Sequence, residues 1–273
     1  MNITKIYCNG CSHSAGGGLE VNRILKNNLN IVDYYSSKYN VKWQNVNEIL
    51  YSTIISNKLN IESINEAASG GGTERVLRMA YDFVKLNWKN KEELFLILEL
   101  PSLGRLDLYS TRLNDYIIAN LHFKNNDYSD NSISGLYGTR GYYKDEYSDD
   151  NSKLEHVLKS YYNNFFSKKP YFLNLVRQVN TFFGYLKSNK IKYIFFGGEL
   201  LPGIDEEYRK HNSLNLKINN KTIEDFHQYA VENNSTVAEE CDFLTDDLHP
   251  GYFAHKNFGN LLSDYIIENY DNL

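Results

Sequence analysis

Short segments with strand character, two of which end at a glycine turn, are the feature that most constrains this fold. Residues 3–8 stop at Gly10, residues 61–67 run into Gly70, and residues 94–98 are apolar throughout. Segments with helical spacing separate these runs, an alternation typical of a parallel sheet covered by helices. The sequence therefore predicts an α/β fold, a three-layer α/β/α sandwich around a central parallel sheet.

Apolar residues at helical spacing place the covering helices. We expect helices over about residues 46–54, 73–84 and 173–186 and from Pro250 through Ile266, with a fourth strand at residues 193–196. Thr73 is a candidate N-cap for the second of these helices, because its hydroxyl can accept from a free amide there.

The alternation is interrupted between about residues 106 and 169, where Tyr, Asn, Asp and Ser are frequent. Residues 125–131 and 142–150 show neither a helical nor a strand period, and glycines punctuate the segment. We expect one domain over residues 1–273, with this Tyr-rich insertion after the third strand. Loops at the carboxyl ends of parallel strands line the ligand crevice, so the insertion can be a lid or a substrate platform. The alternative is an oligomer contact or a long surface loop.

Composition excludes several classes of partner. The net charge is −5 and no run of five like charges occurs, which argues against nucleic acid and anionic membranes as partners. No apolar segment approaches 18 residues and no secretory signal is visible, which predicts a cytoplasmic protein. Three cysteines, Cys8, Cys11 and Cys241, do not indicate a disulfide framework. The pattern does not indicate an oligomeric state.

The first candidate site is Gly10-Cys11-Ser12-His13-Ser14, which directly follows the first strand. A strand that stops at a Gly-x-Ser turn displays a serine hydroxyl at the sheet edge, where it can act as a nucleophile. We do not expect His13 to be its base, because adjacent side chains point apart in extended backbone.

A second motif, Asp246-Asp247-Leu248-His249-Pro250, offers a base near the other end of the chain. Asp246 can orient the imidazole of His249 so that its second nitrogen takes the serine proton. The alternative is that the aspartates only cap the last helix. His255 is a competing base, which we expect instead to be a packing or surface residue.

Two further features allow more than one interpretation. The N–H of Gly70, together with that of Ser12, can stabilise an oxyanion, each donor contributing about 3 kcal/mol, although Gly70–Gly72 also suits a plain turn or a phosphate cradle. Cys8 and Cys11 have the spacing of a redox pair or half a zinc site, with His13 and Cys241 or His249 as further ligands. No second such pair exists, so we expect no metal and structural thiols.

These blocks, in this order, resemble the SGNH (GDSL-type) hydrolase family. The resemblance matches Ser12 to the nucleophile, Gly70 to the oxyanion glycine, and Asp246 with His249 to the rest of the catalytic triad. It implies a flavodoxin-like topology and no cofactor. The Gly-Cys-Ser-His opening is similar to a branch common in bacteriophage genomes, which adds virion association as an alternative location.

One family block is different here. The family places Gly-x-Asn-Asp after the third strand, and its Asn completes the oxyanion hole, whereas this chain has Glu99-Leu100-Pro101-Ser102-Leu103-Gly104-Arg105. Ser102 can donate in its place, or Arg105 can neutralise the charge, unless Arg105 pairs with Asp107 or Glu99. Losing one donor costs a factor of about a hundred to a thousand in rate.

The function implied is that of a serine esterase, similar to carboxylesterases and acetylesterases, acting through a covalent acyl-enzyme. The resemblance implies a small acyl ester as substrate, with an O-acetyl group on a carbohydrate as a candidate, and Arg105 and His13 as candidate substrate-binding residues. Transfer of the acyl group to an acceptor other than water is a sister activity. The alternative of another class is a catalytically degenerate, phage-associated binding or structural module.

Overall fold

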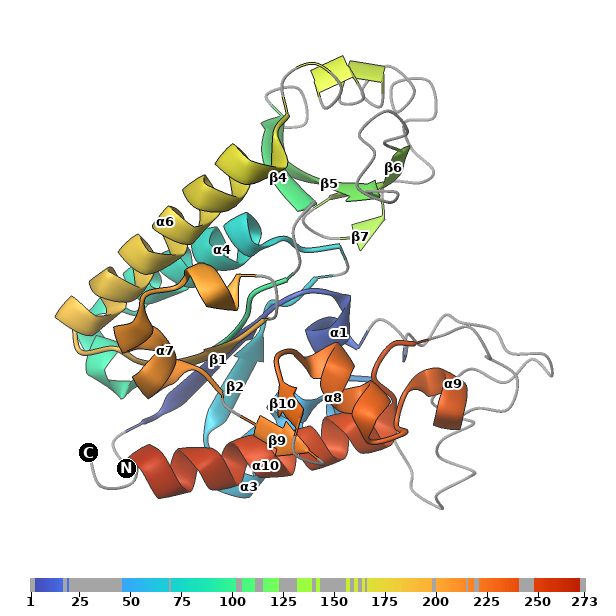
Figure 1. The fold of residues 1–273 in the computed structure, drawn as a ribbon. Helices are drawn as coiled ribbons and strands as arrows, with labels where there is room; N and C mark the ends of the chain where they lie inside the picture. Colours follow the sequence, from blue (N-terminus) through green and yellow to red (C-terminus); the bar gives the residue numbers. More distant parts are fainter. Residues whose placement is uncertain are drawn as a thin grey trace.

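A four-stranded parallel sheet forms the centre of the computed structural model (Figure 1). The structure describes residues 3–16, 19, 46–68, 70–101, 105–110, 115–122, 132–138, 141–142, 156–157, 160–161, 164, 166–197, 200–214, 216–218, 221–240 and 248–270. The strand order is β2-β1-β3-β8, and every neighbouring pair is parallel. These strands are β1 (Lys5–Asn9), β2 (Glu62–Asn65), β3 (Leu94–Glu99) and β8 (Lys192–Phe196).

The register of the sheet brings three strand ends together. Cys8 of β1 lies opposite Asn65 of β2 and Ile97 of β3, so the strands finish at nearly the same level. The turn after β1, the glycine loop after β2 and the last residue of β3 therefore meet at one edge. All six residues of β3 are buried, as expected for an apolar run between two other strands.

Helices cover both faces of the sheet. The helices α4 (Thr73–Leu86) and α6 (Lys168–Ser188) lie on one face, and α3 (Tyr51–Leu59), α8 (Phe226–Glu232) and α10 (Tyr252–Tyr270) lie on the other (Figure 1). Alternate residues of β3 supply the two cores, Leu96 and Leu98 on the α6 side and Phe95 and Ile97 on the α10 side. The predicted three-layer α/β/α architecture with a parallel sheet is confirmed.

Several element boundaries differ from the sequence predictions. The helix expected over residues 46–54 is split at Leu50 into a 3₁₀ turn, η2 (Val46–Ile49), and α3. Thr73 is the first residue of α4 and not its N-cap, because Gly72 occupies that position and the Thr73 hydroxyl donates to the carbonyl of Pro101. The helix expected over residues 173–186 begins earlier, at Lys168, and Leu173 within it is 57% exposed.

The insertion contains an antiparallel sheet that the sequence pattern did not predict. Its strands are β4 (Arg105–Ser110), β5 (Asp115–His122), β6 (Ser132–Gly138) and β7 (Gly141–Tyr142), in that order. Asp107 of β4 forms an ion pair of 2.8 Å with Arg78 of α4, and the Arg78 guanidinium lies 3.5 Å from the centre of the Tyr116 ring. Residues 125–131 and 143–150 lie outside the described residues.

Short elements complete the described part of the chain. They are α1 (Ser12–Ala15), η3 (Trp88–Glu93), η5 (Leu201–Gly203), α7 (Glu206–Asn212), β9 (Leu216–Ile218), β10 (Lys221–Ile223) and α9 (Val237–Glu240). Within the described ranges, no helix combines the length and the apolar character needed to cross a bilayer.

Candidate active site

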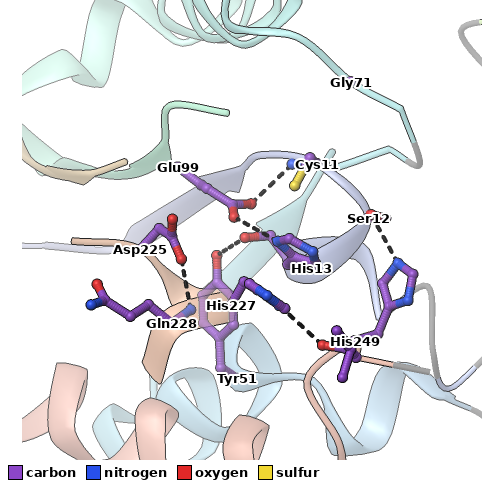
Figure 2. A network of polar contacts seen from close by, with 12 residues as sticks. Cys11, Ser12, His13, Tyr51, Gly71, Glu99, Asp225, His227, Gln228 and His249 are labelled. Atoms are coloured by element: carbon purple, nitrogen blue, oxygen red, sulfur yellow. Dashed lines mark hydrogen bonds and ion pairs between the residues drawn. The ribbon is translucent and has the colours of Figure 1, made fainter. Parts of the chain in front are cut away.

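Ser12 and His249 lie in hydrogen-bond contact although 237 positions separate them in the chain. The Nε2 atom of His249 is 3.1 Å from the Oγ atom of Ser12 (Figure 2). Ser12 opens α1 at the end of β1, and His249 precedes α10. This distance is short enough for the imidazole to accept the serine proton. Asp246 and Ser102 are outside the described residues.

His13 is closer to this pair than the sequence suggested. Residues 12–15 form a helical turn, not extended backbone, and Gly16 ends the turn in the left-handed region at φ 75°. The His13 and His249 ring centres are 5.4 Å apart, and the His13 ring also stacks on His227 at 5.0 Å. The extended geometry from which we excluded His13 as the base is therefore wrong, but its Nδ1 faces Glu99 and not Ser12.

Glu99 is a buried carboxylate directly beneath the serine turn. Its Oε2 accepts the Cys11 N–H at 3.0 Å, and its Oε1 lies 3.6 Å from Nδ1 of His13 (Figure 2). Burial alone would raise the pKa of Glu99, but hydrogen bonds and the charge of His13 outweigh it and lower that pKa to about 2. Burial would likewise lower the pKa of His13, but Cys11 and Glu99 hold it well above its usual value. Both shifts favour the ionised form of the pair.

Sequence reasoning missed the role of Glu99, which it considered only as a partner for Arg105. A signal was available, because Glu99 is the one charged residue that ends the apolar run of β3. A charge at that position requires compensation inside the protein.

The same cluster has the donor types of a metal site. One ligand atom each of Cys11, His13 and Glu99 lies within 4.8 Å of the other two. In the structure these groups bind one another, since Glu99 already faces the Cys11 N–H and His13. Cys8 lies in β1 as a free thiol, and burial raises its pKa far above its usual value, which opposes the thiolate that a redox or zinc site requires.

The glycine loop after β2 is joined to the serine turn by backbone hydrogen bonds. The Ala68 N–H donates to the Gly10 carbonyl at 3.3 Å, and Gly70 has a positive φ of 77°. A Cβ atom on Gly71 would lie 2.9 Å from the carbonyl oxygen of Gly10. The two loops thus approach more closely than a side chain would allow, which puts Gly70 on the loop that adjoins the Ser12 turn.

Asn65, the last residue of β2, connects the same two loops through its side chain. Its Nδ2 donates to the Ser14 carbonyl at 3.0 Å, and its Oδ1 accepts the Ala67 N–H at 3.0 Å. Nearby, the Oδ1 of Asn9 accepts from the Gly10 N–H at 2.8 Å and from buried Arg75 at 3.1 Å. Neither asparagine was predicted, because each acts through contacts between segments distant in sequence.

Arg105 lies against the glycine loop. Its Nη1 donates to the Gly71 carbonyl at 3.0 Å. The acidic residues proposed as its alternative partners have cations of their own, since Asp107 pairs with Arg78 and Glu99 pairs with His13. The contact with Gly71 places the guanidinium beside the loop that carries Gly70.

The segment that carries His249 is held by hydrogen bonds from both sides. The Val237 N–H donates to the His249 carbonyl at 2.8 Å, and Nδ1 of His227 lies 3.0 Å from the Leu248 carbonyl. The carboxylate of Glu240 then accepts the N–H groups of Tyr252 and Phe253 at 2.8 and 2.9 Å, which caps α10. The sequence predicted none of these supports.

His255 is a packing residue, as expected, and not a competing base. Its side chain is fully buried, and Nδ1 accepts the Tyr51 N–H at 3.2 Å. Burial lowers the pKa of His255 to about 3, so it stays neutral at physiological pH.

No protein-family model and no curated protein matches this sequence. Solved structures with similarity include a lipolytic protein of the G-D-S-L family from Desulfitobacterium hafniense DCB-2, with a TM-score of 0.39, 11% identity and coverage of 96% of this chain and 98% of that one. The esterase EstA from Pseudoalteromonas sp. has a TM-score of 0.41 and 10% identity, covering 98% and 97%.

A third similar structure is the acetyl xylan esterase Est2A from the rumen bacterium Butyrivibrio proteoclasticus. Its TM-score is 0.43 with 11% identity, and the match covers 97% of this chain and 63% of that one. All three are lipolytic proteins or esterases. TM-scores at this level carry no argument about this chain, so its chemistry is argued from the geometry of the site.

Proposed function

We propose that this protein is a serine hydrolase that cleaves ester bonds, with Ser12 as nucleophile and His249 as general base. The observation that carries this proposal is the 3.1 Å contact between Ser12 Oγ and His249 Nε2. A serine hydroxyl is a weak nucleophile by itself, and a neutral imidazole at this distance activates it by taking its proton.

The reaction proceeds in two halves. Ser12 Oγ attacks the acyl carbon while His249 Nε2 takes the hydroxyl proton, and His249 then returns that proton to the departing alkoxide. The acyl group remains as an ester of Ser12. His249 next removes a proton from water, the hydroxide attacks the acyl-enzyme, and the carboxylic acid leaves as Ser12 regains its proton.

Asp246 is proposed as the third member of the triad. It would accept from the Nδ1–H of His249, which directs the lone pair of Nε2 toward Ser12. The support is the Asp-x-x-His spacing in the sequence.

The oxyanion would be bound by the N–H groups of Ser12 and Gly70. The backbone hydrogen bond between Ala68 and Gly10 supports this assignment, since it joins the two loops that carry these donors. Arg105 is proposed to contribute positive charge from its position at the Gly71 carbonyl, and Ser102 is the candidate third donor.

The substrate class we propose is a small acyl ester, and O-acetylated carbohydrates are the first substrates to test. A series of p-nitrophenyl esters from acetate to octanoate measures the preferred acyl length. O-acetylated oligosaccharides then test the alcohol part of the ester. Added alcohols distinguish hydrolysis from transfer, because a transferase gives a new ester in place of free acid.

The proposal is tested by intact-mass labelling with a fluorophosphonate, which requires an activated serine but no particular substrate. We expect one adduct on the wild type and none on Ser12→Ala or His249→Ala. His211→Ala, an exposed residue of α7, is the control and should label normally. Folded wild-type protein without an adduct would favour the non-catalytic module.

A further inference from the structure

The carboxylate of Glu99 lies unusually close to the turn that presents Ser12. A Cβ atom built on Gly10 would be 2.3 Å from Glu99 Oε2 and 2.8 Å from Ser14 Oγ, so only glycine permits this approach. Glu99 Oε2 accepts the N–H of Cys11, the residue directly before Ser12. The last residue of β3 thus holds the backbone amide that directly precedes α1.

We propose that Glu99 is the positioning residue of the Ser12 turn and that His13 is the counter-ion that keeps this carboxylate charged. The inference rests on the proposed function, because it states how the nucleophile is held toward His249. The carboxylate contacts the turn on both sides of Ser12, at Cys11 and at His13.

The geometry explains why an ion pair is required at this position. Glu99 is 2% exposed, and an isolated carboxylate at such a site would be strongly disfavoured. The His13 imidazole compensates it from 3.6 Å, and its own side chain is 23% exposed. The ionised form accepts hydrogen bonds more strongly than a neutral acid would, which restrains the Cys11 amide.

The surrounding groups come from several elements. Cys11 precedes α1, His227 belongs to α8, and His249 precedes α10, and all three face His13 in the described part of the chain. Tyr51 of α3 donates to Ser14 Oγ at 3.0 Å. Besides the larger effect of burial, the charge of Glu99 acts on the pKa of Tyr51 and on the pKa of His255. Cys11 and Glu99 both raise the pKa of His13, and Glu99 is the carboxylate among these groups, so neutralising Glu99 removes the carboxylate partner of His13.

The test compares second-order rates of fluorophosphonate labelling for the wild type, Glu99→Gln, His13→Asn and His13→Ala. Because small misplacement of a nucleophile has a large effect on rate, we expect Glu99→Gln to label about ten- to a hundredfold more slowly. The loss should fall on the maximal labelling rate and not on the probe concentration at half-maximal rate. His13→Asn keeps a donor near the Nδ1 position and should recover part of what His13→Ala loses.

Asp107→Asn is the matched control. Asp107 is 3% exposed and its partner Arg78 is 22% exposed, so this pair closely resembles Glu99 and His13 in burial. It joins α4 to β4, and the described contacts of Asp107 are with α4 and not with the Ser12 turn. If only general stability mattered, both substitutions would reduce labelling alike, whereas the proposal predicts a loss for Glu99→Gln alone. Labelling of folded Glu99→Gln within twofold of the wild type would overturn the proposal.

A second measurement is independent of catalysis. Nuclear magnetic resonance of ¹⁵N-labelled wild type should show the His13 imidazole protonated beyond pH 6.5, and the Cys11 amide proton should move upfield in Glu99→Gln. An imidazole that titrates like a free histidine, with an unmoved Cys11 amide, would refute the positioning role even if labelling succeeds. If His13 is protonated in the wild type and the Cys11 amide moves in Glu99→Gln, but the wild type forms no adduct, the hydrolase proposal is refuted and the positioning role is retained.

Discussion

The His227 imidazole holds the residue that precedes His249, because its Nδ1 lies 3.0 Å from the carbonyl oxygen of Leu248. A carbonyl oxygen only accepts, so Nδ1 must carry the hydrogen. Burial lowers the pKa of His227, and the charge of His13 lowers it further, so the ring is a neutral donor. The proposed base is therefore oriented in part by a second histidine.

Replacing His227 with leucine should slow labelling of Ser12 by about tenfold, because the Leu248 carbonyl loses its donor and His249 gains freedom. His227→Asn places an amide N–H near the same position and should retain most of the rate. The measurement is the labelling rate on samples of equal folded fraction. Equal rates for the two variants would show that the hydrogen bond does not orient His249.

Capping of α10 by Glu240 predicts a loss of stability in Glu240→Gln. The amide side chain keeps one acceptor, but it turns an N–H donor toward a second backbone N–H, and the charge that favours a helix N-terminus disappears. We expect the free energy of unfolding, measured with urea, to be lower than that of the wild type by about 1–3 kcal/mol. Labelling should also slow, since the capped turn begins three residues after His249.

Glu239→Gln is the neighbouring control for that experiment. Glu239 accepts the Thr236 N–H at 2.8 Å in a capping box at the start of α9, where glutamine serves equally well. The free energy of unfolding of Glu239→Gln should stay within about 0.5 kcal/mol of that of the wild type. A comparable loss in both variants would contradict a specific role for Glu240.

The contact between the glycine loop and the serine turn predicts that Gly71→Ala reduces activity. Its Cβ would lie 2.9 Å from the backbone oxygens of both Ala68 and Gly10, so the loops must separate. In contrast, a Cβ on Gly184 of α6 meets only the Tyr208 hydroxyl at 3.2 Å, and alanine favours a helix interior. Esterase assays should show a loss in Gly71→Ala but not in Gly184→Ala.

The buried neutral state of His255 predicts part of the pH dependence of stability. The pKa of folded His255 is about 3, against an ordinary histidine pKa of 6.5, so the unfolded chain takes up this proton first as the pH falls. Stability contributed by neutral His255 is thus present above pH 6.5 and is lost progressively toward pH 3. His255→Asn keeps an acceptor for the Tyr51 N–H but does not titrate.

Urea unfolding of wild type and His255→Asn across that range measures the effect. With falling pH, the free energy of unfolding of the wild type should decrease more steeply than that of His255→Asn, by up to about 1.4 kcal/mol per pH unit. Glu99 contributes to acid sensitivity in both proteins, because its folded pKa is also lowered, and its effect therefore cancels in the comparison. Parallel curves would show that folding does not lower the pKa of His255.

The sequence alone determined the layered fold and the residues that meet at the candidate site. A short apolar run such as residues 94–98 is typical of a strand buried on both faces, and a serine directly after a strand lies at a sheet edge. Both motifs follow from local chemistry, which is why Ser12 and His249 could be named before any contact between them was known.

The tertiary structure decided which groups support those residues. Glu99 is an acidic residue at the end of a strand in the sequence, and only the approach of Gly10 and His13 gives it a buried ion pair. His227 and Glu240 act on His249 and α10 through contacts between separate segments. Such contacts depend on how helices pack on the sheet, and no local pattern of residues records that packing.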